Sequence, residues 1–445
     1  MKSFTATGRI SKAKLYCVAP VVLAIAASLA MPIIGATAAA IASISLMVLA
    51  LVMTGLSFGA LSPLSIIVAI SALYAVAPGI GILTESQEQL IEPQIYFGSA
   101  LPLSLLYLAT VLALYGLQQR PRMDATGLVA LLPSRRRMVY VAICSLCGSL
   151  TYLYSISQDV GLTVAAFDRG EQQFALGTRT SVLAMLAASG SLYGLGMWTL
   201  ARRYGQDYPW PTKLLLLLAL CVFAYSSVYL LGDRRIFLST VIGVLAVTKF
   251  SRQMTVVLLL LALPAYIMFA AYSGLRGVPT DQWAMRFDAL EIKSVVDPSR
   301  GEFGGWARIA QDVLSKPYAE IADATVLKAP LSVVPSFLYP DRPLAPSLWY
   351  VHTYDPATAM RGGAWAFSLV VESFMNFWVF GPIVLGYFVS MAIARFEGNA
   401  MRCMLMVFVL AFSFRADLVS IIQQGGWMLL FMGSYYAVSR GVRFR

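Results

Sequence analysis

Arginines at the edges of apolar stretches are the residues of this chain best placed for chemistry. Arg234 and Arg235 stand together in the sequence GDRR, and Arg415 lies in FRADLVS. A guanidinium binds phosphate oxygens through a planar fork, so several guanidiniums that converge near a membrane surface favour a site for a phosphate-rich lipid headgroup. Three further arginines belong to this candidate substrate-binding set: Arg179, Arg276 and Arg361.

Arg415 is the most unusual of these arginines. Arg402 and Arg440 are too close in sequence for two full membrane passes of about 20 residues each plus a turn. With a turn at QQGG, residues 423–426, Arg415 is predicted to lie two helical turns below it, in the outer half of the membrane. An arginine at that depth needs a partner. Besides a ligand, the alternative partners are carboxylates in salt bridges that only lock helices together: Asp417, Glu372 or Asp233.

The elements that must position these residues are transmembrane helices. Hydrophobic residues make up 59% of the 445 positions and charged residues 12%, with a mean hydropathy of +0.73, which no soluble globular protein of this length would show. About twelve apolar runs have roughly the 17 to 25 residues that a helix needs to cross a bilayer. The expected spans are 15–34, 36–56, 62–83, 95–117, 138–157, 181–200, 213–231, 236–250, 254–273, 366–394, 403–422 and 427–439.

The distribution of basic residues predicts the orientation. Positively charged loops stay on the cytoplasmic side, so an even number of spans places both termini in the cytoplasm. Basic clusters such as 135–137 and 202–203 then lie inside. The net charge of +11 follows from this topology together with contact to anionic membrane lipids, and it gives no case for nucleic acid binding.

A large loop on the outer face divides the chain into three parts. Residues 1–273 are expected to form nine spans, 274–363 the loop, and 364–445 three spans. Helical periodicity predicts amphipathic helices at 280–296 and 304–317, the second with the apolar stripe Trp306, Ile309, Ala310 and Val313. The proline-rich stretch after residue 335 predicts an extended cover. A loop of this length favours a substrate-enclosing lid, with a plain extracytoplasmic loop as the alternative.

No metal site or cofactor is predicted. The motif C-S-L-C at 144–147 is the only close pair among five cysteines, and one pair cannot supply the four ligands of a zinc site. Small apolar packing residues are the expected role of these cysteines.

The motif order resembles that of Wzy-type O-antigen polymerases, the oligosaccharide repeat-unit polymerases of bacterial inner membranes. The resemblance rests on GDRR, on GLRG at 274–277, on GGAWAFSLVVESFMNFWVFG after the loop, and on FRADLVS at 414–420. It implies an all-α polytopic membrane protein of about twelve transmembrane helices with one large periplasmic loop and a GT-C-like glycosyltransferase architecture. The active site would lie on the periplasmic face.

The implied activity joins undecaprenyl-diphosphate-linked oligosaccharide repeat units into a surface polysaccharide. The arginine set would stabilise the negative charge that develops on the leaving diphosphate. A polysaccharide chain-length regulator is a further partner that the resemblance implies, whereas a metal is not required when arginines supply the positive charge.

Two residues could act as the base that takes a proton from the acceptor hydroxyl. Glu372 lies near the outer end of its expected span, and His352, the only histidine, lies near the end of the loop in WYVHTYDP. Glu372 could instead orient an arginine or a sugar hydroxyl, and His352 could be a structural loop residue. Asn376, which shares the helix face of Glu372, and Asp417 complete the candidate substrate-binding residues.

Two other functions fit parts of the pattern. An O-antigen ligase would transfer finished polymer to the lipid A core with the same helix plan and the same arginines. A lipid-linked oligosaccharide flippase is less favoured, because it would carry cationic residues along a central cavity and inverted repeats. Here the unusual charges gather at one face.

Overall fold

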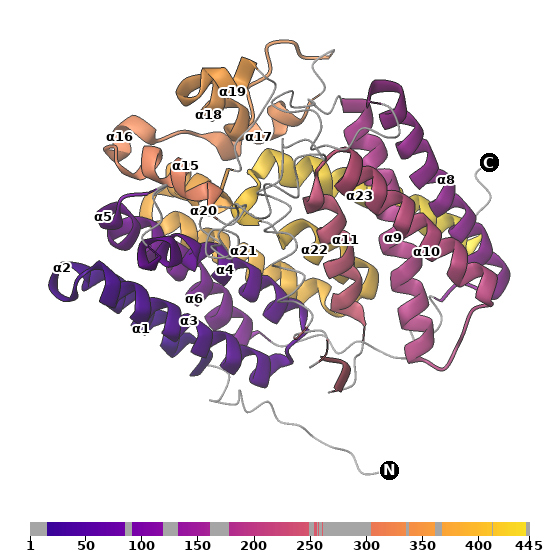
Figure 1. Ribbon diagram of the computed structural model, residues 1–445, viewed down its shortest axis with the longest axis horizontal. Coiled ribbons are helices and arrows are strands. Elements are labelled where there is room, and N and C mark those ends of the chain that lie inside the picture. The colour runs from indigo at the N-terminus through magenta and orange to yellow at the C-terminus, as the bar shows by residue number, and fades with distance from the viewer. Residues whose placement is uncertain are drawn as a thin grey trace, which may run out of the picture.

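The structure is a computed structural model of the chain (Figure 1). It describes residues 16–84, 91–118, 132–160, 178–248, 253–255, 257, 260, 304–334, 338–360, 367–411 and 413–441. Every regular element in these ranges is a helix, and no strand occurs among them.

The first half of the chain forms long helices that pack side by side. In chain order they are α1 (Val18–Leu29), α2 (Met31–Ile34), α3 (Ala36–Phe58), α4 (Pro63–Leu83), α5 (Pro93–Ile95) with the π-helical η2 (Tyr96–Ala100), α6 (Leu101–Leu117), α8 (Arg135–Val160), α9 (Thr178–Arg203), α10 (Trp210–Ala224) with the π-helical η3 (Tyr225–Leu230), and α11 (Arg234–Val247). The expected break between the first two spans is confirmed. Gly35 ends α2 at a φ of +84°, a left-handed conformation that favours glycine.

The second half begins with short helices and ends with longer ones. In chain order they are α15 (Gly305–Leu314), α16 (Tyr318–Ile321), α17 (Thr325–Val333), α18 (Pro346–Tyr354), α19 (Pro356–Met360), α20 (Leu369–Phe377), the 3₁₀ turn η6 (Trp378–Phe380), α21 (Gly381–Phe396), α22 (Ala400–Leu410), the 3₁₀ turn η7 (Ser413–Arg415) and α23 (Leu418–Arg440). Figure 1 shows α15 to α19 grouped along one edge of the bundle.

Seven helices of the described chain are long and apolar enough to cross a membrane, which identifies a polytopic membrane protein. They are Ala36–Phe58, Pro63–Leu83, Pro93–Leu117, Arg135–Gln158, Thr180–Arg203, Trp210–Leu230 and Leu369–Phe396. The expected count of about twelve also needs α1, α11, α22 and α23, which are shorter or less apolar. It further needs the span at 254–273, most of which lies outside the described residues.

The predicted turn at 423–426 is wrong. Helix α23 runs without a break from Leu418 to Arg440, and the chain turns earlier, between Leu410 and Leu418. Two glycines inside a helix cost only about 1 kcal/mol each, an amount that packing overrides. Asp417 instead begins the helix, because its side chain accepts a hydrogen bond from the Ser420 amide. Arg415 therefore lies in the turn itself and not two turns below it.

Helices α11 and α22 are short and pack against each other and against α9. A methyl group at Gly243 of α11 would lie 2.8 Å from Leu192 of α9 and 3.1 Å from the Met404 carbonyl oxygen of α22, so glycine permits this close approach. The nine-residue step from Gly243 back to Arg234 covers about 14 Å, and the fourteen-residue step from Leu192 back to Thr178 covers about 21 Å. Helix α11, whose first residue is Arg234, therefore begins about 7 Å deeper in the bundle than the start of its longer neighbour α9.

A sharp break separates α20 from α21. Trp378 adopts a φ of +51°, and Pro382 stands in the first turn of α21, where its missing amide hydrogen costs nothing. A Cβ at Gly381 would lie 1.9 Å from the Ser373 carbonyl oxygen, so only glycine fits. Glu372 and Asn376 thus sit on the nine-residue α20, which this break divides from α21 within the segment Leu369–Phe396.

The described part of the large loop confirms one prediction and corrects another. In α15 the predicted apolar stripe is buried, with Trp306, Ile309, Ala310 and Val313 all facing the core. The proline-rich segment is not wholly extended, because Pro346 and Pro356 begin α18 and α19. Proline is favoured at the first helical position, where no amide donor is needed. The predicted helix at 280–296 lies outside the described residues.

The two ends of the bundle are chemically distinct. The basic end is formed where α8 and α22 begin and where α9 and α23 finish, and the Tyr208 hydroxyl donates to the Pro133 carbonyl there over 3.0 Å. The opposite end is formed where α11 and α23 begin. Residues Arg234 and Arg415 lie at that opposite end.

Candidate functional site

Arg234, Arg235 and Arg415 form what we call the cationic cluster. The charged and titratable groups that act most strongly on Arg415 are those of Tyr74, Arg235, Asp233 and Arg234. Three guanidiniums therefore lie within electrostatic reach of one another. Among these strongest neighbours of Arg415, two are arginines and one, Asp233, is a carboxylate.

Two arginines of the cationic cluster stand at the start of α11. Asp233 is the N-cap, and its Oδ1 accepts a hydrogen bond of 3.1 Å from the Arg235 amide. A helix N-terminus carries a partial positive charge, so Arg234 and Arg235 stand where cations are disfavoured. Arg234 is nevertheless only 3% exposed. The buried Arg235 Nε makes no hydrogen bond within the described residues. An anion bound here would relieve both the repulsion and the burial of charge.

Aromatic packing holds the turn that carries Arg415. The ring of Phe414 stacks on Tyr74 with centroids 5.9 Å apart, while Trp306 meets its edge at 5.8 Å and Tyr107 at 5.9 Å. Each such pair contributes about 0.5 to 1.5 kcal/mol beyond the burial of area. The Trp306 indole N–H donates to the Tyr74 carbonyl over 2.9 Å, which ties the loop helix α15 to α4. Arg415 is thus held beside a rigid aromatic group.

Tyr74 and Phe414 were not among the residues predicted from the sequence. Tyr74 is fully buried, and its hydroxyl lies within electrostatic reach of Arg415 and Arg235. It occupies an ordinary position in an apolar run of α4, so no local pattern distinguishes it from a packing residue. Phe414 directly precedes Arg415, and that adjacency is the one signal that could have pointed to it.

Glu372 and Asp417, the acid pair, both accept hydrogen bonds from backbone amides at the start of α23. Glu372 is 1% exposed, and its Oε2 accepts from the Leu418 amide over 2.7 Å. Asp417 accepts from the Ser420 amide over 2.7 Å and from the Ser347 amide of α18 over 3.1 Å. Carboxylates are stabilised at helix N-termini. The acid pair therefore joins α20 and α18 to α23.

One oxygen of Glu372 differs from the other. Its Oε1 is buried and accepts no hydrogen bond of good geometry within the described chain, although the Thr325 hydroxyl is a neighbour. A buried carboxylate oxygen without a donor is disfavoured by about 1 to 3 kcal/mol or more. Oε1 is thus the atom of Glu372 that is left to accept a proton.

Asn376 joins α20 to the start of α17 through hydrogen bonds. Its Oδ1 accepts from the Val326 amide over 3.0 Å, while its Nδ2 donates to the Thr325 hydroxyl over 2.6 Å and to the Glu372 carbonyl over 2.8 Å. Its amide group is therefore engaged in joining α20 to the first turn of α17.

The other predicted site residues lie outside this arrangement or outside the described residues. His352 stands in the last turn of α18 and is exposed. Arg179 belongs to the first turn of α9, with its side chain outside the description. Arg276 and Arg361 both lie in undescribed segments. Within the described ranges, no three His, Cys, Asp or Glu side chains gather as a metal site would require.

Comparison with known proteins does not assign a family. No family model matches this chain, and no curated protein and no solved structure is significantly similar to it. The functional assignment therefore rests on the chain's own residues.

Proposed function

We propose that this membrane protein is a glycosyltransferase that uses lipid-diphosphate-linked sugars, of the O-antigen polymerase type. The observation that supports this most strongly is the cationic cluster. It combines three guanidiniums, one of them 3% exposed, with a helix N-terminus at one end of an apolar bundle. A diphosphate supplies negative charge on several oxygens, which planar guanidinium forks bind well.

The proposed reaction makes one bond and breaks one. The acceptor sugar hydroxyl oxygen bonds to the anomeric carbon of the growing polymer, and the bond between that carbon and the diphosphate oxygen breaks. The diphosphate leaves with the electron pair, and the acceptor proton passes to a base. Arg234, Arg235 and Arg415 stabilise the charge that develops on the leaving group, and a single donor of this kind contributes about 100-fold to 1,000-fold in rate.

Glu372 is the first candidate for the base. Its Oε2 is held by the Leu418 amide, which fixes the carboxylate while leaving Oε1 to take the proton. Its burial requires the acceptor hydroxyl to reach the start of α23. His352 is the second candidate, because it is exposed near the end of the loop and an imidazole nitrogen can act as a base. Asp417 and Asn376 support the site by fixing α23, α18 and α17.

The cellular setting belongs to the same proposal. The chain crosses the inner membrane of a bacterium about twelve times, with both termini in the cytoplasm and the cationic cluster on the periplasmic side. The separation of the basic end from the cluster supports this orientation, because positively charged loops stay in the cytoplasm. Undecaprenyl-diphosphate-linked oligosaccharides are the substrates, with a chain-length regulator as a partner.

A deletion strain tests the proposal. Its lipopolysaccharide is separated on a gel beside that of the parent and of a strain complemented with the intact gene. A core that carries one repeat unit supports the polymerase. Bare core with free lipid-linked polymer identifies an O-antigen ligase, and an unchanged pattern of surface polysaccharides contradicts both.

A further inference from the structure

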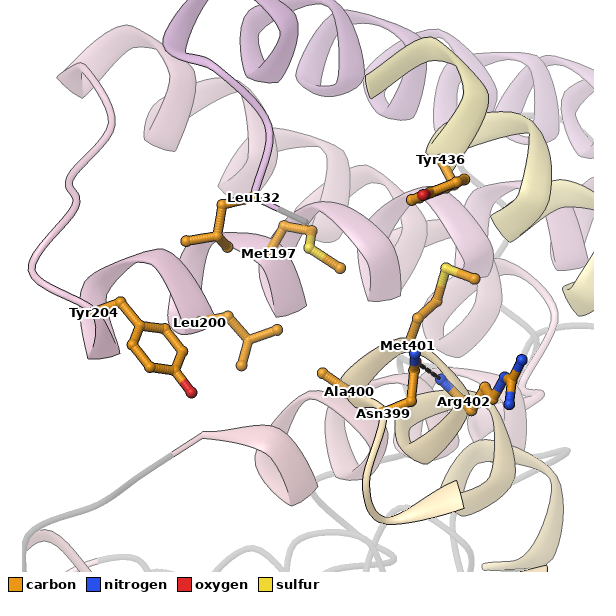
Figure 2. Close-up of a pocket in the computed structure, with 9 residues that line it drawn as sticks. All are labelled: Leu132, Met197, Leu200, Tyr204, Asn399, Ala400, Met401, Arg402 and Tyr436. Carbon is orange, nitrogen blue, oxygen red and sulfur yellow. Dashed lines mark hydrogen bonds between the residues drawn. The ribbon is translucent and has the colours of Figure 1, made fainter. Parts of the chain in front are cut away.

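A second site lies at the basic end of the bundle, far along α23 from the cationic cluster. A cavity of about 220 Å³ opens there between α9, α22 and α23. Figure 2 shows Met197 and Leu200 of α9 across the cavity from Ala400 and Met401. One enclosed water needs only about 15 Å³ of such space, so the cavity can hold a much larger apolar group.

Guanidiniums surround the apolar walls. The Arg203 guanidinium lies over the ring of Tyr204, at 5.8 Å from its centroid. The Arg440 guanidinium lies 5.3 Å from the ring centroid of Tyr436, and its Nε donates to the Tyr436 hydroxyl over 3.1 Å. Both of these rings line the cavity. A guanidinium therefore lies against each of the two tyrosine rings that line the cavity.

A third guanidinium stands on the remaining wall. Arg402 is exposed, and Figure 2 shows its guanidinium directed away from Met197 and Leu200, at the rim of the cavity. Asn399 caps this eleven-residue helix by accepting from the Arg402 amide over 3.1 Å. The helix N-terminus adds a partial positive charge to the rim.

The described acids of this end do not cancel that charge. Asp207 binds Lys213 over 2.6 Å, which lowers the pKa of Asp207. Glu397 accepts a hydrogen bond from the Tyr115 hydroxyl. Neither carboxylate lines the cavity. The cavity thus combines apolar walls with a cationic rim.

We propose that this cavity binds an anionic phospholipid of the surrounding bilayer. One acyl chain packs against Met197, Leu200 and Met401, and the phosphate lies toward Arg402 and Arg203. A soluble anion would make no contact with the apolar walls, and a neutral lipid would gain nothing from the positive charge of the rim. Basic pockets between transmembrane helices on the cytoplasmic side bind such headgroups. This proposal does not depend on the reaction at the other end.

Thermal unfolding of the purified full chain in detergent tests the proposal. Phosphatidylglycerol is titrated in parallel with phosphatidylcholine and with soluble glycerophosphate. We expect phosphatidylglycerol to raise the unfolding temperature at concentrations where the other two have no effect. Equal stabilisation by phosphatidylcholine would contradict a role of the cationic rim in binding. Equal stabilisation by glycerophosphate would contradict a role of the apolar walls.

Matched variants locate the binding. Arg402→Gln should weaken phosphatidylglycerol binding about tenfold, because one charged hydrogen bond to phosphate is lost. The control is Arg136→Gln, an exposed arginine of α8 that does not line the cavity. If Arg402→Gln does not fold, Arg203→Gln serves in its place. An equal loss in the control variant shows general attraction to the basic end and overturns the site.

Discussion

Both ends of the helix bundle carry arginines, yet they hold them in opposite ways. At the basic end Arg136, Arg202 and Arg402 are exposed to the surroundings of the bundle. At the opposite end Arg234 is 3% exposed, and Arg415 is held in a turn beside stacked aromatic rings. An exposed charge near water costs little, whereas a charge in the interior requires compensation. Arginines therefore indicate the orientation in the membrane at the basic end, whereas at the opposite end they indicate a candidate ligand site.

Helix length produces this difference. The basic end is built partly by α8 and α9, which are 26 residues each, so the arginines at their termini reach the surface. Helices α11 and α22 have 14 and 11 residues and cover only about 21 Å and 17 Å. Because α11 begins deeper in the bundle than the start of α9, its first residue, Arg234, is buried. A short helix beside a long one thus places an arginine inside the molecule.

The largest expected effect is at Arg415. Arg415→Gln removes the charge and should lower polymer formation about 100-fold or more, because one preorganised donor to the leaving diphosphate is lost. Polymer length on gels and sugar transfer by purified protein measure this effect, at a protein level equal to that of the parent. Parental polymer from a normally expressed variant would show that the cationic cluster has no catalytic role.

A subtler change tests the geometry of the cluster. Arg235→Lys keeps the positive charge but replaces a planar fork with a point charge, so we expect about tenfold lower transfer. Substrate titration of the purified protein separates a change in KM from a change in kcat. Wild-type kinetics in this variant mean that charge alone, and not the shape of the guanidinium, matters at the start of α11.

Two substitutions of Glu372 distinguish a structural role of this residue from a chemical one. Glu372→Ala leaves the Leu418 amide without its acceptor and should lower the free energy of unfolding by about 1 to 3 kcal/mol. Glu372→Gln keeps a carbonyl acceptor, so its stability should stay close to that of the parent while transfer is lost. The control for stability is Glu320→Ala, at an exposed glutamate of α16. Retained transfer in Glu372→Gln removes this residue as the base.

Asn376 offers a smaller effect on stability. Asn376→Ala deprives the Val326 amide of its acceptor, and the lost hydrogen bond should lower the free energy of unfolding by about 1 kcal/mol. Asn376→Asp keeps the oxygen acceptor for the Val326 amide but loses the donor to the Glu372 carbonyl, so it should recover only part of this loss. Thermal unfolding of the two variants side by side measures the difference. Equal unfolding temperatures for both variants and the parent would mean that this contact does not stabilise α17.

The smallest effect is expected at the basic end. Arg136→Gln should change the free energy of unfolding by less than about 0.5 kcal/mol, as exposed substitutions usually do. Sugar transfer should be unchanged. A large loss of activity in this variant would erase the contrast between the two ends, because an exposed charge would then matter as much as a buried one.

Much of the helical plan is predictable because hydropathy is a local property. In the first half of the chain, the apolar runs mark the long helices within a few residues, and the break at Gly35 follows from a residue that tolerates positive φ. The buried stripe of α15 is predictable for the same reason, because it follows from the helical spacing of apolar residues within one short segment. The arginines of GDRR and FRADLVS are visible as charges at the edges of apolar runs.

The turn before α23 shows where local patterns fail. Glycines at 425 and 426 suggest a turn, but they are also tolerated within a packed helix at a small cost. The choice was decided by Asp417, which accepts amide hydrogen bonds from both α23 and α18. Ser347 is distant from Asp417 in sequence, so no local window contains both.

The sequence by itself determined that this chain is helical, that it is built for a membrane, and which arginines are candidates for phosphate binding. Only the tertiary structure decided that Tyr74 lies near Arg415, that Glu372 holds the start of α23, and that a cavity of about 220 Å³ opens at the basic end. The reason is physical: hydropathy and periodicity depend on neighbouring residues, whereas burial and partner choice depend on helices that meet only when the chain has folded.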